Sequence, residues 1–152
     1  MAERTGEALD LLRGQGPGAD RTAYDRAVQN ANVVWWQRHT GTKVLLSAHD
    51  EHVGYVAVDP ASNPKTQGAF LRETLGAGYV SVGVTFDRVR HRDYVVDLRS
   101  VGSPAREWLA KARPTRTIGT AYPDGPNDIV LRRSHDVLIH LHEVETSTLR
   151  DV

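Results

Sequence analysis

The chain has 152 residues, of which 39% are hydrophobic and 25% charged, and its 19 basic residues balance its 19 acidic ones. This length suits a single domain with a substantial hydrophobic core. The balanced charge creates no field that would attract nucleic acid or an anionic membrane, so we expect neither as a partner. The lack of cysteine excludes thiol catalysis and zinc-thiolate sites.

The sequence also bears on the cellular location. No apolar run approaches the ~20 residues of a transmembrane helix, and the N-terminus has no apolar signal-peptide core. We therefore expect a cytoplasmic protein.

The first half of the chain alternates helical and strand patterns. Glycines in residues 14–18 separate a short expected helix from the rest, which predicts an extension over residues 1–20 and an α/β domain over 21–152. A long helix is expected over residues 22–39 and a second over 66–75. The apolar residues 43–48 and 79–86 read as β-strands on either side of the second helix. Strand, helix and strand then form one βαβ unit with a parallel sheet.

The second half adds three shorter elements. Residues 94–98 are apolar enough for a strand, residues 104–112 for a helix that begins at a proline, and residues 137–141 for a final strand. Together these elements predict an α/β fold: a mostly parallel sheet of about four strands with flanking helices.

Titratable residues follow the expected strand at 43–48. They are His49, Asp50, Glu51 and His52, and open α/β sheets place their sites at the C-terminal ends of strands. We predict that both histidines are catalytic acid/base groups and that one of the two carboxylates orients them. Two histidines supply too few ligands for a metal, so no metal or other cofactor is expected.

The residues that flank this segment and the later histidines receive other roles. Ser47 and Tyr55, which lie on either side of the histidines, are assigned to substrate binding. His135, His140 and His142 surround the last expected strand. We interpret them as structural, on the less buried face of the sheet.

Other hydrolase and nucleotide motifs are missing from the sequence. There is no Gly-x-Ser-x-Gly nucleophile elbow, and Ser81 lies within a strand pattern without the leading glycine. Dinucleotide-binding and P-loop glycine motifs are also absent.

The order of several segments resembles the erythromycin esterase family. Residues 32–36, Asn-Val-Val-Trp-Trp, and residues 48–53, Ala-His-Asp-Glu-His-Val, are similar to its Asn-x-x-Trp helix end and its Ala-His-Asn-x-His-Val segment. Residues 71–73, 79–86, 97–99 and 136–141 look like the pieces that follow. The resemblance covers residues 24–146 and corresponds to the C-terminal half of the family, because the Gly-Glu-x-x-His segment of its N-terminal half has no counterpart here.

This resemblance implies a hydrolase that cleaves a small-molecule carboxylic ester or macrolide lactone, and hence a link to antibiotic resistance, with water activated by His49 or His52. Asp50 stands where the family has asparagine. Two alternatives stay open: a ligand-binding or accessory module without catalysis, and a fragment that needs a separate N-terminal half. A truncated sheet would leave an uncovered edge, so self-association is also expected.

Overall fold

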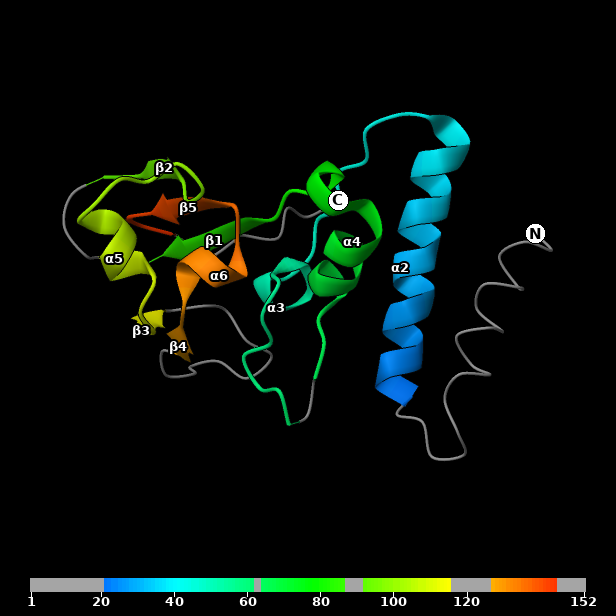
Figure 1. The fold of residues 1–152 in the computed structure, drawn as a ribbon, viewed down its shortest axis with the longest axis horizontal. Coiled ribbons are helices and arrows are strands. Elements are labelled where there is room, and N and C mark those ends of the chain that lie inside the picture. The colour runs from blue at the N-terminus through cyan, green and yellow to red at the C-terminus, as the bar shows by residue number, and fades with distance from the viewer. Residues whose placement is uncertain (1–20, 62–63, 87–91, 116–126, 145–152) are drawn as a thin grey trace, which may run out of the picture.

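The computed structural model describes residues 21–61, 64–86, 92–115 and 127–144 (Figure 1). The helix expected before residue 14 lies outside these residues, as does the whole predicted extension over residues 1–20. In chain order the elements are α2 (Arg21–Thr40), α3 (Asp50–Val53), α4 (Gln67–Leu75), the 3-10 turn η1 (Gly76–Gly78), β1 (Val82–Phe86), β2 (Tyr94–Asp97), α5 (Ala105–Leu109), β3 (Arg113–Thr115), β4 (Asn127–Ile129), α6 (Leu131–Ser134) and β5 (Val137–Leu141).

The mixed α/β class is confirmed, but the prediction of a mostly parallel sheet of about four strands is wrong. The main sheet has three strands in the order β1-β5-β2, and β3 and β4 form a separate antiparallel pair. β5 is parallel to β1 and antiparallel to β2. A parallel β2 would need a crossover of a dozen or more residues. The connection over residues 87–93 is too short for that, so β2 runs in the reverse direction.

The expected strand at residues 43–48 does not form. The backbone there is irregular, and Leu45 is 93% exposed. Gly41, with φ of 64°, ends α2 and lets the chain turn away from it. No strand in the described part of the chain pairs with this segment. Since an extended segment becomes a strand only by pairing, the predicted βαβ unit is wrong as well.

The hydrophobic core lies between the sheet and the two short helices α5 and α6. Buried leucines from β5, the residue after β2 and both helices form one cluster, and partly buried aliphatic side chains pack against it. The cluster consists of Leu98, Leu109, Leu131 and Leu138, with Val96, Val101 and Ile129 packed against it.

A second packing unit joins α2, α3 and α4, which lie on the other side of β1 from the rest of the sheet (Figure 1). Thr66 caps α4 by accepting a hydrogen bond from Ala69 N, and its hydroxyl donates to Gly54 O at 2.5 Å. Gly68 allows α4 to approach closely, because a Cβ there would lie 2.1 Å from Val53 O. Leu71 is completely buried at the centre of this unit.

The face assignment of β5 was wrong for one histidine. His140 is 7% exposed and shares the more buried face of β5 with Leu138. Its Nδ1 lies 3.1 Å from the Thr85 hydroxyl, and its ring stacks on Tyr94. An imidazole with a hydroxyl partner and an aromatic neighbour is satisfied in a core position that alternation alone assigns to the solvent.

Candidate functional site

The histidine segment forms the start of a short helix instead of the tip of a strand. His49 is the N-cap of α3, and its Nδ1 accepts a hydrogen bond from Glu51 N at 3.3 Å. In the neutral ring that accepts this bond, the proton sits on Nε2. His49 is half-buried and His52, in the last turn of α3, is exposed. His49 therefore presents a donor from a fixed position, whereas His52 meets solvent.

Asp50 covers the free edge of β1. Both of its carboxylate oxygens accept from Val84 N, each at 3.1 Å. Burial raises the pKa of Asp50, and the Val84 amide, His135 and His49 oppose that rise in decreasing order. The carboxylate thus holds α3 against the sheet, while we had expected it to orient a histidine.

Ser81 and His135 form a buried pair whose protons can be assigned. The Ser81 hydroxyl donates to Val53 O at 2.9 Å and lies 2.9 Å from His135 Nδ1. A hydroxyl has one proton, so it must accept from Nδ1–H, which leaves Nε2 of neutral His135 as an acceptor. Burial lowers the pKa of His135, partly offset by Asp50 and Asp136. The ring lies against Gly83, where a Cβ would come within 2.6 Å of Cδ2.

His135, Asp50 and Glu51 line one small cavity. Its volume of about 20 Å³ is sufficient for a single water molecule. The remaining walls come from five elements or loops and are mostly apolar; they are Val56, Val58, Thr85, Thr115, Ile129, Leu131 and Ser134. Neither His49 nor His52 lines this cavity. The structure therefore brings together both predicted carboxylates and a histidine that we had interpreted as structural.

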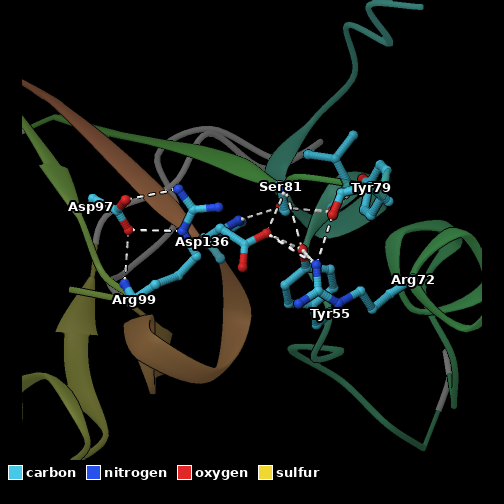
Figure 2. Close-up of polar contacts among 9 residues, drawn as sticks. Tyr55, Arg72, Tyr79, Ser81, Asp97, Arg99 and Asp136 are labelled. Carbon is cyan, nitrogen blue, oxygen red and sulfur yellow. Dashed lines mark hydrogen bonds and ion pairs between the residues drawn. The ribbon is translucent and has the colours of Figure 1, made fainter. Parts of the chain in front are cut away.

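Asp136 is the centre of a second polar network (Figure 2). Its Oδ2 accepts from the Tyr55 hydroxyl and from Ser81 N, the latter at 3.1 Å, and lies 3.6 Å from Arg72 Nη1. Arg72 also donates to Tyr79 O at 2.7 Å. Burial and then Asp136 raise the pKa of Tyr55 above its ordinary value, and burial raises that of Tyr79 to about 12. Both phenols are therefore neutral hydrogen-bond donors at neutral pH.

The two residues assigned to substrate binding have different surroundings. Ser47 is exposed in the irregular segment before α3. Tyr55 belongs to the Asp136 network and lines a second cavity, of about 350 Å³, together with Arg72, Arg99 and Arg132. Of the residues that line this second cavity, only Tyr55 was predicted from the sequence as a site residue. A signal was present for Asp136, because a carboxylate directly before an apolar strand is as conspicuous as the one after residues 43–48.

In the ranges that the structure describes, no group of three or more histidines or carboxylates is arranged to hold a metal ion. No helix of these ranges is long and apolar enough to cross a membrane.

The fold and the site together define a mixed α/β domain in which His135, Asp50 and Glu51 line one cavity beside a small sheet. A sequence model of the erythromycin esterase family matches residues 8–90, which include α2, the histidine segment, α4 and β1. The chain belongs to the erythromycin esterase family. No curated protein matches it significantly.

Two solved structures share the fold. One is described as a succinoglycan biosynthesis protein, with 21% identity and a TM-score of 0.70. The other is a protein from Bacillus cereus, with 24% identity and a TM-score of 0.65. Each alignment covers 78% of this chain and 37% of the other. The chain thus spans little more than a third of the length of these structural neighbours, and the likeness concerns the fold alone.

Proposed function

We propose that this chain is a hydrolase of the erythromycin esterase type, which cleaves a carboxylic ester or macrolide lactone with an activated water. The observation that carries the proposal is the family match, since residues 8–90 contain all four predicted catalytic residues, His49, Asp50, Glu51 and His52. The geometry adds His135, which lines the one-water cavity with both carboxylates.

The proton arrangement supports a division of labour between histidines. His135 has an acceptor at Nε2, as a general base requires, whereas His49 has a donor at Nε2, as is needed to polarise a carbonyl or protonate a leaving group. In the proposed reaction the water oxygen attacks the acyl carbon and its proton passes to an imidazole. The bond from that carbon to the alkoxy oxygen then breaks, and the alkoxide takes a proton. His52 is assigned to substrate contact or proton exchange with solvent.

The experiment is a turnover assay with variants that distinguish the catalytic role of the His49 imidazole from its role as the N-cap of α3. His49→Ala removes both the imidazole and the N-cap, whereas His49→Asn keeps a good cap and removes only the imidazole. We expect both variants to lose at least about 100-fold in kcat/KM, the ordinary contribution of a general acid or base. His39→Asn, on exposed α2 surface, is the control. Normal turnover by His49→Asn would contradict the proposal, and ligand binding without any turnover would favour the accessory-module alternative.

The choice of substrates follows from the comparisons. Simple carboxylic esters and macrolide lactones test the family assignment directly. Because one structural neighbour is described as a succinoglycan biosynthesis protein, acylated saccharides belong in the same panel.

A second observation favours the alternative in which another polypeptide segment completes the domain. A groove of about 730 Å³ lies between the end of α2, residues 41–46 and residues 75–82. Leu45, Val80 and Val82 are exposed beside it, although each is a strand-forming aliphatic residue. We propose that the remaining part of the family domain, which this chain does not span, occupies this groove. That part can lie on the same polypeptide or on a separate one.

Co-expression tests that arrangement. A polypeptide that carries the remaining part of the family domain should co-purify with this chain and raise its turnover. Leu45→Asp should weaken the association, while Val144→Asp, an exposed aliphatic position away from the groove, should not. Full turnover and a clean monomer without any added segment would contradict it, and self-association through the groove would replace it.

A further inference from the structure

The second cavity, lined by Tyr55, Arg72, Arg99, Arg132 and Asp136, has an unusual charge pattern. Its lining contains three guanidinium groups and one carboxylate. The guanidinium groups come from α4, from the turn after β2 and from α6. Leu98 and His135 complete the wall. Its volume of about 350 Å³ is within the range of small-molecule sites.

Two of the three arginines have counter-charges. Arg99 forms a two-pronged ion pair with Asp97, with Nε at 2.9 Å and Nη2 at 2.7 Å from its oxygens. This pair lowers the pKa of Asp97 to about 2. Arg72 is 3.6 Å from Asp136 and donates to Tyr79 O. Figure 2 shows these two arginines on either side of the Asp136 carboxylate.

Arg132 has no such partner among the residues that the structure describes. Its Nε is buried and makes no hydrogen bond. Asp136 lines the same cavity but does not accept from this nitrogen, and the hydrogen bonds of its Oδ2 come from Tyr55 and Ser81. A buried guanidinium nitrogen without an acceptor is costly, and in native proteins a ligand, an ion or a water molecule commonly supplies the acceptor.

We propose that this cavity binds an oxyanion, a carboxylate or phosphate group that accepts from Arg132 Nε and lies between Arg72 and Arg99. Guanidinium groups match the planar, paired oxygens of both ligand types. One positive charge remains after the Arg99–Asp97 and Arg72–Asp136 pairings, so a monoanion neutralises the site. The phenol of Tyr55 borders the cavity as a neutral donor. Anion binding here does not require the proposed hydrolysis, although His135 borders both cavities.

Titration of the full chain with inorganic phosphate and with succinate, at constant ionic strength set with chloride, tests the proposal. We expect saturable binding of at least one probe by calorimetry. Phosphate alone would indicate a tetrahedral anion, and succinate alone a carboxylate. Arg132→Gln should weaken binding at least about tenfold, the usual effect of losing a charge-assisted hydrogen bond. Its neighbour Arg133, exposed on α6 and outside the cavity, provides the matched control Arg133→Gln.

An NMR measurement on the unmodified protein tests the same site without any variant that could misfold. In the unmodified protein the Nε–Hε NMR signal of Arg132 should shift with the same saturation curve as the calorimetric binding. Absence of saturable binding by both probes would overturn the proposal. So would equal weakening in both glutamine variants together with an unshifted Arg132 signal. Neither result depends on turnover, so the hydrolase proposal stands or falls separately.

Discussion

Two apolar segments of this chain have similar strand-forming sequences and different structures. Residues 79–86 contain β1, which pairs with β5 along its whole length. Residues 43–48 pair with nothing in the described chain and leave Leu45 93% exposed. The difference lies in their surroundings. Ser81 N donates to Asp136, just before β5, whereas no hydrogen bond of this kind holds residues 43–48 within the described ranges. A strand-forming sequence therefore indicates that a segment is able to pair, and an available partner strand determines whether it pairs.

The anchor at the start of β1 gives the largest expected effect. Asp136→Ala would leave the Tyr55 hydroxyl and Ser81 N without their acceptor in a buried site and Arg72 without its counter-charge. We expect the free energy of unfolding, measured with urea, to fall by about 3–5 kcal/mol.

A matched carboxylate shows whether burial is the reason. Asp97→Ala removes an ion pair with Arg99 that is open to solvent, so we expect a much smaller loss of stability. If the two variants were equally destabilised, Asp136 would not be what holds β1 to β5.

Gly83 within β1 gives the next effect. Gly83→Ala would place a Cβ 2.6 Å from His135 Cδ2 and 2.8 Å from Nε2, in a ring that has little room to move. We expect a loss of about 1–3 kcal/mol in unfolding free energy. Gly102→Ala, where a Cβ meets nothing within 4 Å, should stay within about 0.5 kcal/mol of the parent.

A double-mutant cycle sharpens this prediction. In a His135→Ala background the added methyl group has space, so the cost of Gly83→Ala should largely disappear. Additive losses would mean that Gly83 matters for the β1 backbone and not for the ring.

These comparisons also show what the sequence could predict. The helices α2 and α4 and the strands β1, β2 and β5 follow from local periodicity and capping, such as Thr66 before α4. Asp50 and Glu51, which were predicted as site residues, line one cavity, and their catalytic role stays a prediction. Pairing and burial depend on residues far apart in the chain. The partners in the Ser81–His135 and Tyr55–Asp136 contacts come from distant segments, so no local pattern could show that they meet.

The buried histidine predicts a pH effect of moderate size. Burial lowers the pKa of His135, so between its folded value and the ordinary 6.5 the unfolded chain binds the proton and the folded protein does not. Stability should therefore fall as the pH drops below 6.5, with a contribution of at most about 1.4 kcal/mol per pH unit.

His135→Phe should remove that slope, which urea unfolding at pH 7.5, 6.0 and 5.0 would measure. Asp50 has the opposite effect on stability, because burial raises its pKa above 3.8 in the folded protein. Between that raised pKa and 3.8 the folded protein binds the proton and the unfolded chain does not, so this contribution to stability increases as the pH falls. An unchanged slope in His135→Phe would show that the ring is not the group that titrates.

The smallest expected effect concerns the unpaired segment. Leu45→Lys should change the unfolding free energy by less than about 0.5 kcal/mol in this chain alone, because the side chain is in solvent. Leu138→Ala, in the core, should cost about 2–5 kcal/mol. A large loss from Leu45→Lys would mean that residues 43–48 are buried by a contact that this structure does not contain.

The contact between Asp50 and Val84 has a consequence for solubility. An outermost strand offers unused amide groups to any passing extended peptide, which is a common route to aggregation. By occupying the Val84 N–H with both carboxylate oxygens, Asp50 places a negative charge where such a peptide would have to insert a carbonyl. Asp50, which lies within the histidine segment, thus disfavours the pairing of another chain's strand with the edge of β1.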